Sequence, residues 1–492
     1  MKHEHAADLL FVAAAVLAVA FIASWTIADP DLWGHVRFGL DILAAGTIPR
    51  EDPYSFTSDR PWINHEWLSE VTMAGAYRAG GAPGLIGLKW LITGVTLALL
   101  WRTVRLAGVR RPAAAVLLLL AGLGAFGLIM TVRPQLFSML LFVLELSILN
   151  EAGRGRHRAL LWTPMLFAVW ANVHGGWMVG LGVLGLWSAG MLLSRALPWP
   201  WAAGITVLSA LGTLITPYRF ELWRFLWETV RIGRADITEW QPLTFAPVLL
   251  VPWTAAAGLV VLAFWRRRWS ALPLLGPVLA LAVLSFRVSR LDGFFALASV
   301  VLLAPAFAGL GPESLPLSRR STRAELAIVI VMFAVGAAAA GLRAGAWAGC
   351  LTIPGPKEAD DWAPEAESVV FLQQNPLRGR LLSYFSYGEL AIWHFAPRLV
   401  VSYDGRRETV YSERVRQAHI DFYSESPDIS YPDRIEADYI WVPRRLAAVG
   451  PLTAAGWETV FEGTQSVVLS RRHSGPYVQP APWAGPRCFP GP

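Results

Sequence analysis

The sequence predicts an all-α polytopic membrane bundle, followed by a small C-terminal soluble α/β domain. Hydrophobic residues make up 54% of the 492 residues, and charged residues make up only 16%. Apolar segments recur through the first two thirds of the chain, and most are close to the length that a helix needs to cross a bilayer. From about residue 362 the apolar segments become short and strand-like, which is typical of a compact soluble domain.

The bundle is expected to contain about 11 transmembrane helices by the length criterion. The apolar segments are residues 9–28, 83–106, 112–130, 134–149, 159–171, 175–194, 199–216, 247–265, 271–286, 293–310 and 324–342. Segment 159–171 is short for a span.

Three amphipathic segments between the spans predict helices that lie on the membrane surface: residues 32–45, 66–79 and 220–231. Each has an apolar stripe at helical spacing, and none is long and apolar enough to span. In the first of them, Arg37 and Asp41 are four residues apart and can pair on the polar face.

The C-terminal part divides into two regions by composition. Short strand patterns occur at residues 380–384, 399–403, 439–442 and 466–469, with helical patterns between them. The expected domains are therefore a transmembrane domain over 1–345, an outward-facing soluble α/β domain over 346–475, and a Pro/Gly-rich tail over 476–492 that is predicted to be disordered.

Arginine in the short loops predicts the orientation in the membrane. With the N-terminus in the cytoplasm, every strongly basic loop falls on the cytoplasmic side, as the positive-inside rule requires. These loops contain Arg102, Arg105, Arg110, Arg111, Arg154, Arg156, Arg158, Arg195, Arg266, Arg267, Arg268, Arg319, Arg320 and Arg323. The distribution explains the basic balance without nucleic-acid binding, and it places loop 29–82 and the C-terminal domain outside.

Only two cysteines are present, Cys350 and Cys488, which excludes a disulfide scaffold and a Cys-rich metal site. The predicted topology places both on the outer, oxidising side of the membrane. A disulfide between them and two unpaired thiols both remain open.

Polar side chains gather at the outer ends of the spans. Asp29 and Asp31 stand directly at the end of the first span, where carboxylates are costly unless they have partners or a function. We expect them to line one outward cavity with His35, Arg37, His65, Glu66, Glu70, Arg133, Gln135, Asn172, His174, Tyr218, Arg219, Glu239, Gln241, Arg287, Arg290 and Asp292.

This set of side chains suits a phosphorylated lipid. Arginine binds phosphate oxygens with two hydrogen bonds, and a carboxylate can act as a general base or hold a divalent cation. Each residue also has a structural alternative. Asp31 could cap the helix over 32–45, the arginines could anchor the spans at the interface, His174 could belong to a tight turn, and the pair His65-Glu66 could start a helix.

Several motifs resemble the first outer loop of bacterial GT-C glycosyltransferases, which are related to the protein O-mannosyltransferase and lipid A aminoarabinose transferase families. The motifs are Asp29-Pro30-Asp31-Leu32-Trp33-Gly34-His35, Gly46-Thr47-Ile48-Pro49, Asp52-Pro53-Tyr54-Ser55-Phe56-Thr57 and Trp62-Ile63-Asn64-His65-Glu66-Trp67-Leu68. Later segments resemble an uncharacterised branch of this class: Arg133-Pro134-Gln135, Asn172-Val173-His174-Gly175-Gly176, Ser289-Arg290 and Asp404-Gly405-Arg406.

The resemblance implies a GT-C-like bundle in a bacterial inner membrane and a polyprenyl-phosphate-linked sugar donor, with a glycan, lipid or protein as acceptor. It implies that Asp31 is the catalytic base and that Asp29 assists it, and a divalent cation such as Mg²⁺ or Mn²⁺ could bind to both. The donor phosphate is assigned to Arg133, Arg287 and Arg290. The acceptor side is assigned to His35, His65, Glu66, Gln135, Asn172 and His174.

Two other functions remain open from the sequence. A lipid-linked saccharide transporter would need polar residues through the depth of the membrane, but the middles of the spans are apolar except at Lys89 and Glu145. A non-catalytic scaffold that binds a lipid carrier would not need the acids that this chain retains.

Overall fold

The computed structural model describes residues 2–230, 237–267, 272–308, 319–343, 349–354, 362–471 and 476–492. The chain forms two compact units. The first unit consists of Met1–Trp25 and Ile86–Trp347, and the second consists of Thr26–Leu85 and Ala348–Pro492. The long loop after the first apolar segment and the C-terminal part of the chain therefore fold together as one body.

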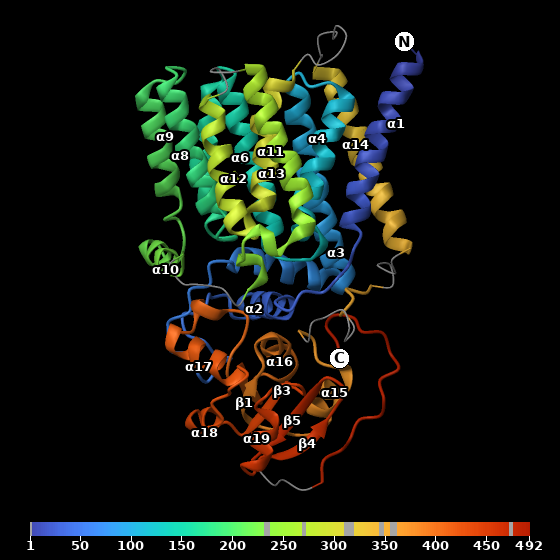
Figure 1. Cartoon of the computed structure of the whole chain (residues 1–492), viewed down its shortest axis with the longest axis vertical. Helices are drawn as coiled ribbons and strands as arrows, with labels where there is room; N and C mark the ends of the chain where they lie inside the picture. Colours follow the sequence, from blue (N-terminus) through green and yellow to red (C-terminus); the bar gives the residue numbers. More distant parts are fainter. Residues whose placement is uncertain are drawn as a thin grey trace. The chain divides into compact units, whose positions relative to one another are not determined.

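The first unit is helical. Its helices are α1 (Lys2–Ala23), α4 (Arg111–Gly124), α5 (Phe126–Met130), α6 (Gln135–Gly153), α7 (Thr163–Trp170), α8 (Trp177–Leu193), α9 (Trp199–Gly212), α10 (Phe220–Val230), α11 (Pro247–Arg267), α12 (Leu272–Arg287), α13 (Asp292–Leu302) and α14 (Arg319–Arg343). Short 3₁₀ turns add η1 (His157–Trp162), η2 (Thr238–Trp240), η3 (Leu243–Phe245), η5 (Ser289–Leu291) and η6 (Ala304–Phe307). Helix α13 contacts α4, α6, α11 and α12, and all its residues are buried, so it forms the centre of the bundle (Figure 1).

Helix α3 (Trp67–Leu106) begins in the second unit and continues into the first. Its backbone is not helical at Gly80 and Gly81, and Gly81 has a φ of 61°, which glycine adopts more readily than other residues. The predicted surface helix over 66–79 and the predicted span over 83–106 are therefore two arms of one interrupted helix.

Four helices of the described residues are long and apolar enough to cross a membrane. They are Trp67–Leu106, Gln135–Gly153, Pro247–Arg266 and Arg323–Gly341, and the shorter apolar helices are Asp8–Ala23, Arg111–Gly124, Trp177–Leu193 and Leu274–Arg287. Each of the eleven predicted segments contains a helix within its described residues, but the number of spans stays a prediction.

Two of the three predicted surface helices have nearly the expected bounds. Helix α2 (Leu32–Ala45) starts and ends where the sequence predicted, and it is followed by Gly46, whose φ of 66° ends the helix. Helix α10 covers the predicted segment up to Val230, and Arg231 lies outside the described residues.

The second unit is built on a five-stranded sheet with the order β2-β1-β3-β5-β4. The strands are β1 (Gly379–Ser383), β2 (Leu399–Val401), β3 (Tyr439–Pro443), β4 (Glu458–Glu462) and β5 (Ser466–Ser470). Strands β1, β2 and β3 are parallel, while β5 is antiparallel to β3 and β4. The sequence predicted four of these strands and missed β4, because this edge strand has exposed acidic residues at both ends.

The helices of this unit include α15 (Ala366–Gln374), α16 (Gly388–Phe395), α17 (Glu413–Tyr423), α18 (Tyr431–Arg434) and α19 (Val449–Ala454), with 3₁₀ turns η8 (Phe385–Tyr387) and η9 (Arg407–Thr409). The first loop extends the sheet at its β2 edge, where Ser55 pairs with Val401 in parallel. The Phe56 N–H donates to the Val401 carbonyl (3.1 Å), and the Val401 N–H donates to the Tyr54 carbonyl (3.0 Å).

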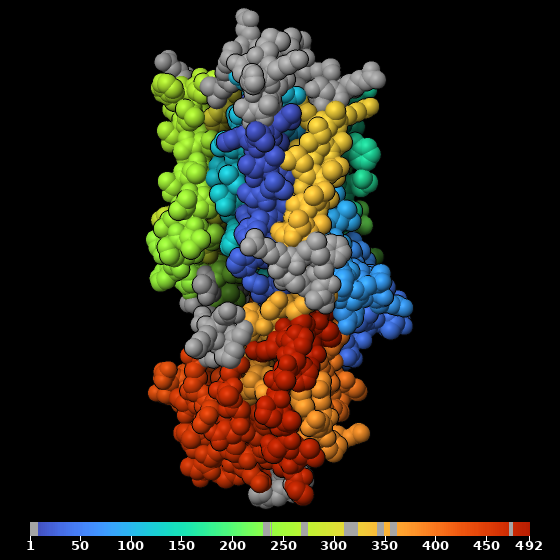
Figure 2. Space-filling view, turned by 90° about the vertical axis from the view of Figure 1, so that its right-hand side faces the viewer, coloured from blue at the N-terminus to red at the C-terminus, as the bar shows by residue number. Residues whose placement is uncertain are grey.

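The tail beyond residue 475 makes defined contacts, whereas the sequence predicted disorder. Cys350 and Cys488 form a disulfide, so the sequence alternative of a bridge holds. Next to it, Phe489 is buried and packs on Trp33 with ring centres 5.3 Å apart, and Trp33 Nε1 donates to the Pro490 carbonyl (2.6 Å). Figure 2 shows the dark red tail on the surface of the C-terminal part. One aromatic anchor and one bridge thus fix a segment whose composition alone indicates disorder.

Candidate functional site

Asp31 stands at the N-terminal end of α2, in the second unit. Its side chain makes no capping hydrogen bond to this helix. The main-chain N–H of Asp31 donates to Asp29 Oδ1 at 3.0 Å, and Asp29 is buried. Asp29 therefore shapes the turn before α2, and the geometry does not support the alternative that Asp31 is only a helix cap.

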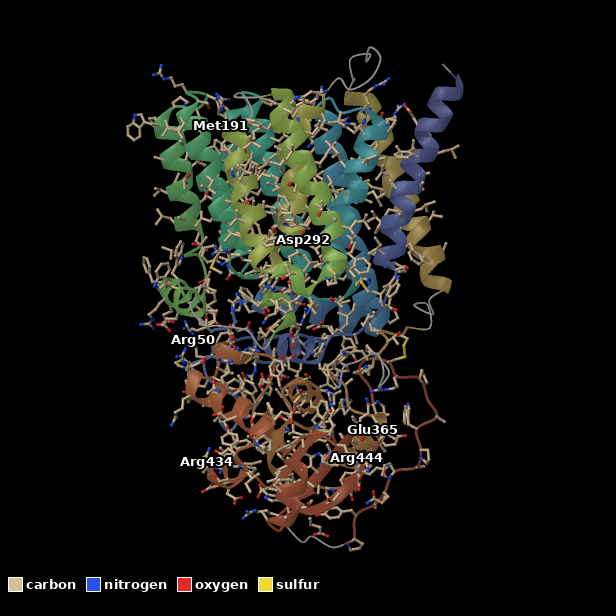
Figure 3. All side chains as sticks on the ribbon, in the orientation of Figure 1. Arg50, Met191, Asp292, Glu365, Arg434 and Arg444 are labelled. Carbon is tan, nitrogen blue, oxygen red and sulfur yellow. A yellow bond between two sulfur atoms is a disulfide. The ribbon has the colours of Figure 1, made fainter. Side chains whose placement is uncertain are left out.

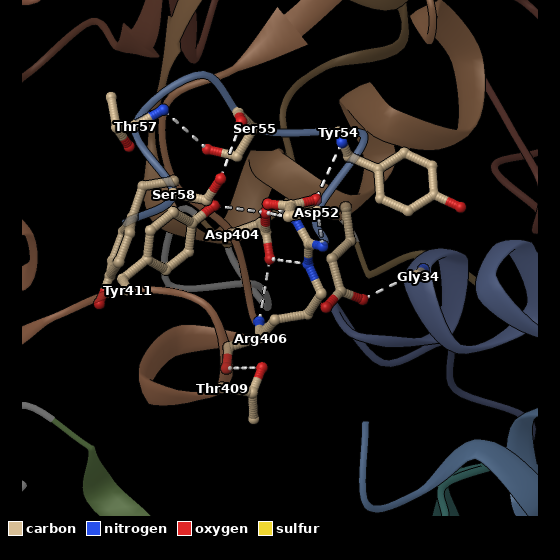
Figure 4. Close-up of polar contacts among 12 residues, drawn as sticks. Gly34, Asp52, Tyr54, Ser55, Thr57, Ser58, Asp404, Arg406, Thr409 and Tyr411 are labelled. Atoms are coloured by element: carbon tan, nitrogen blue, oxygen red, sulfur yellow. Dashed lines mark hydrogen bonds and ion pairs between the residues drawn. The ribbon is translucent and has the colours of Figure 1, made fainter. Parts of the chain in front are cut away.

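The Asp31 carboxylate lies beside a second carboxyl group, that of Glu389 in the first turn of α16. A Cβ atom at Gly405 would be 2.4 Å from Asp31 Oδ1 and 2.6 Å from Glu389 Oε1. Glu389 Oε2 accepts a hydrogen bond from the Gly34 N–H at 3.1 Å (Figure 4). Burial and the charges of Asp31 and Asp404 raise the pKa of Glu389 well above its usual range.

A buried arginine joins the first loop to the residues after β2. Arg406 donates to Asp52 through Nη1 (2.6 Å) and Nη2 (2.9 Å), and to Asp404 through Nε (2.8 Å) and Nη2 (2.7 Å) (Figure 4). Its guanidinium also lies 4.9–5.2 Å from the ring centres of Trp62, Phe38 and Tyr54. Burial opposes ionisation of Asp404, but the Arg406 charge outweighs burial and lowers the pKa of Asp404.

His35, one turn into α2, is held between two glutamates. Its Nδ1 lies 3.3 Å from Glu70 Oε1 and 3.9 Å from Glu66 Oε2, and Glu70 Oε2 accepts from Asn64 Nδ2 at 2.6 Å. Burial would lower the pKa of His35, but the hydrogen bond to Glu70 and the charges of both glutamates raise it to about 9. His35 is therefore a cation at neutral pH. His65 Nε2 lies 3.7 Å from Glu66 Oε1, so four of the residues predicted to line the outward cavity meet here: His35, His65, Glu66 and Glu70.

In the first unit, two of the three predicted phosphate-binding arginines converge on one carboxylate. Arg133 Nη1 lies 2.8 Å from Glu239 Oε1, and Arg290 Nη1 lies 3.4 Å from Glu239 Oε2. Burial would raise the pKa of Glu239, but the two arginines outweigh it and lower the pKa. Arg287, at the end of α12, is exposed and has no ion pair with any described residue.

His174 is fixed in one tautomer by its neighbours. Its Nδ1 accepts from the Gly176 N–H at 3.0 Å and lies 2.7 Å from Ser138 Oγ. Because an amide N–H can only donate, Nδ1 is an acceptor, and the proton of the neutral ring is on Nε2. The tight turn proposed as the structural alternative is thus present, and it leaves His174 Nε2 as a hydrogen-bond donor.

Asn172 and Gln135 have different environments. Asn172 Nδ2 donates to the carbonyls of Ala168 (2.8 Å) and Ile215 (2.7 Å), so it ties the end of α7 to the loop after α9. Gln135 is buried at the start of α6, and its Oε1 has no hydrogen-bond partner within the described part of the chain. Asn172 thus has a structural contact, and Gln135 keeps an acceptor available.

A divalent cation at Asp29 and Asp31 would need further ligands. Mg²⁺ binds oxygen in near-octahedral geometry, usually through one or two carboxylates, several waters and substrate phosphates. Among the described residues, no group of three or more His, Cys, Asp or Glu side chains could hold a metal ion. A cation at Asp29 and Asp31 therefore stays a prediction, in which waters and the donor phosphate would supply the remaining ligands.

A cavity of about 320 Å³ lies along the polar face of α2. Asp41 Oδ2 accepts from Arg37 Nε (2.7 Å) and from the Tyr54 hydroxyl (2.6 Å) at its wall. Phe38 and Ile42 add apolar surface. A mixed lining of this kind, with few fixed polar groups, is typical of a small-molecule site.

Glu389 and Asp404 are the residues that sequence reasoning did not assign. They follow the carboxyl ends of β1 and β2, where ligands bind to parallel α/β sheets. The strands over 380–384 and 399–403 were predicted, so the positions of both acids relative to the sheet were a usable signal.

Comparison with known proteins identifies the fold. No protein-family model matches this chain, and no curated protein matches it. Among solved structures, ArnT from Cupriavidus metallidurans bound to undecaprenyl phosphate is similar at 14% identity and a TM-score of 0.54, covering 95% of this chain and 98% of ArnT. The apo state of the same protein gives 14% identity, a TM-score of 0.56 and the same coverage.

The mycobacterial arabinofuranosyltransferase AftD is 17% identical with a TM-score of 0.47, over 94% of this chain and 41% of AftD. The similarity to ArnT extends over nearly the whole of both chains. This chain therefore has a GT-C-like membrane fold, as the resemblance to the lipid A aminoarabinose transferase family implied.

Proposed function

We propose that this protein is an integral membrane glycosyltransferase that transfers a sugar from a polyprenyl-phosphate donor to an envelope acceptor on the outer face of the bacterial inner membrane. The observation that carries the proposal is Asp31, a carboxylate at the end of the first apolar segment that follows a fixed turn and makes no side-chain capping hydrogen bond to α2. The ArnT fold supports it, since one ArnT structure contains undecaprenyl phosphate.

In the proposed reaction, Asp31 and the two arginines each have one role. Asp31 takes the proton from the acceptor hydroxyl, and the resulting oxygen attacks the anomeric carbon of the donor sugar. The bond from that carbon to the phosphate oxygen breaks, and polyprenyl phosphate leaves with the electron pair. Arg133 and Arg290 are assigned to the phosphate, because guanidinium groups bind its oxygens with charge-assisted hydrogen bonds.

The acceptor is assigned to the cavity along α2. Arg37, Asp41 and Tyr54 offer polar groups in fixed positions, which is the arrangement that orients a hydroxylated ligand. Asp31 and Asp41 are ten residues apart on or next to α2, so their backbones are about 15 Å apart along the helix. An acceptor longer than one sugar unit would reach both.

The proposal is tested in a deletion strain by mass spectrometry of its carrier-linked sugars and envelope glycans. Loss of the protein should cause one carrier-linked sugar to accumulate and its product to disappear. The parent gene should restore the product, and Asp31→Asn should not, although the variant inserts normally. Asp428→Asn, at an exposed carboxylate of the same unit, is the matched control and should restore it. Restoration by Asp31→Asn would contradict the proposal.

The orientation is tested separately. Alkaline phosphatase fused after residue 492 should be active, and a fusion in the loop that contains Arg154 and Arg156 should be inactive. The reverse pattern would contradict an active site on the outer face.

A further inference from the structure

The carboxyl group of Glu389 has no role in the reaction proposed above, yet it is only 3% exposed and lies against the start of α2. Its Oε2 accepts the Gly34 N–H at 3.1 Å, and its Oε1 lies beside Asp31 Oδ1 at Gly405. Glu389 and Gly34 are 355 residues apart in the chain, so the contact joins the C-terminal part to the loop that contains Asp31.

Two glycines make room for this contact. A Cβ atom at Gly34 would be 2.1 Å from Glu389 Oε2 and 2.3 Å from its Cδ, so the Glu389 carboxyl group would have to move away. A Cβ atom at Gly405 would collide with Asp31 as well as Glu389. Neither glycine has a positive φ, so backbone conformation does not require glycine at these positions. The space for the two carboxyl groups does.

Stability gives no reason for this arrangement. Burying a carboxyl group costs free energy unless it is well paired. Asp31 adds a second acid within the same space, and the Arg406 guanidinium, whose charge acts on Glu389, is hydrogen-bonded to Asp52 and Asp404. Costly contacts of this kind persist at functional sites, where they hold reacting groups in place.

We propose that Glu389 is a positioning residue of the active site, which fixes the orientation of the Asp31 carboxylate by filling the space between Gly34 and Gly405 and by accepting the Gly34 amide hydrogen bond. The C-terminal part of the chain thereby completes a site whose base comes from the first loop. This inference rests on the proposed role of Asp31.

The first test is a series of substitutions at Glu389, measured on purified full-length protein. The probe is the lipid extract of the deletion strain, and the rate is the undecaprenyl phosphate released at saturating extract. Glu389→Ala removes both contacts and should lower this rate about 10–100-fold, since small displacements of a reacting group cost this much. Affinity for added undecaprenyl phosphate should stay within threefold of the parent.

Glu389→Gln distinguishes positioning from a chemical role. The amide has the same shape, and its oxygen can still accept from the Gly34 N–H, so this variant should keep at least a third of the parent rate. A loss as large as that of Glu389→Ala would overturn the proposal and make Glu389 itself a reacting group. A parent-like rate for Glu389→Ala would overturn it too.

The second test uses the glycine contact. Gly34→Ala alone should reduce the rate, because its methyl group collides with Glu389. Adding Glu389→Ala removes the collision, so the double variant should be no slower than Glu389→Ala alone. Losses that multiply would show that the two residues act independently and would overturn the proposal. The thermal transition of every variant is measured beside its rate, and each rate is expressed per mole of folded protein.

Asp31→Asn separates this inference from the proposed function. A parent-like rate for Asp31→Asn would overturn both. A large loss for Asp31→Asn with a parent-like rate for Glu389→Ala would leave the proposed function standing and overturn only the positioning role.

Discussion

Replacing Arg406 with methionine should strongly destabilise the second unit. The side chains of Asp52 and Asp404 are 0% exposed and both bind this guanidinium. Removing one partner of a buried ion pair costs about 3–5 kcal/mol, because the remaining charge stays buried. In a unit of about 200 residues each kcal/mol corresponds to about 2–4 °C, so the thermal transition should fall by roughly 6–20 °C. Methionine retains apolar contact with the surrounding rings.

The assay is thermal unfolding of the purified protein in detergent, followed by tryptophan fluorescence. Arg434→Met is the matched control, since Arg434 pairs with Asp428 at 2.7 Å on the surface of the same unit, where the two side chains are 52% and 38% exposed (Figure 3). An exposed pair contributes about 0–1 kcal/mol, so its transition should fall by less than about 4 °C. Adding Asp52→Asn to Arg406→Met should recover part of the loss. Equal shifts for the two arginine variants would refute this account of the network.

The remaining predictions concern three other groups. The folded pKa of His35, about 9, lies above its ordinary value of 6.5. The charged ring therefore stabilises the fold by about 3 kcal/mol below pH 6.5, and this contribution is lost as the pH rises through 9. The difference in thermal transition between the parent and His35→Gln should shrink from pH 6 to pH 10, and a constant difference would contradict the prediction. Glu239→Gln removes the negative charge that the two arginines hold, so affinity for undecaprenyl phosphate should rise several-fold, and an unchanged affinity would exclude these arginines as its site. Replacing Cys350 and Cys488 with serine removes a cross-link over 138 residues. In the chain-entropy model this cross-link contributes about 4–5 kcal/mol to the free energy of unfolding. Non-reduced peptide mapping of the parent should find the bridge, and free thiols at both positions would contradict it.

Local patterns were sufficient for helix α2. The apolar stripe over 32–45 gave α2 its bounds, because Asp31 precedes it and Gly46 ends it with a left-handed backbone. Composition carries no signal for the contacts of the tail, since these come from Phe489 and a cysteine bridge.

Long-range contacts could not be predicted in the same way. The contact of Glu389 with Gly34 has no local signal, since a glutamate in the first turn of a helix is ordinary. Arg105 indicated only orientation in the sequence, but in the structure it binds Glu325 at 2.9 Å in a buried pair. The environment of Asp31 therefore depends on the folding of the first loop and the C-terminal part into one unit.

The most direct test of the central claim is the rate at which the purified protein releases undecaprenyl phosphate from the lipid extract of the deletion strain. The parent and Asp428→Asn should turn over at the same rate. Asp31→Asn should be slower by about a hundred- to ten-thousand-fold, which is the usual contribution of a general base, while its affinity for undecaprenyl phosphate is retained. An Asp31→Asn variant that releases undecaprenyl phosphate as fast as the parent would contradict the assignment of Asp31 as the base.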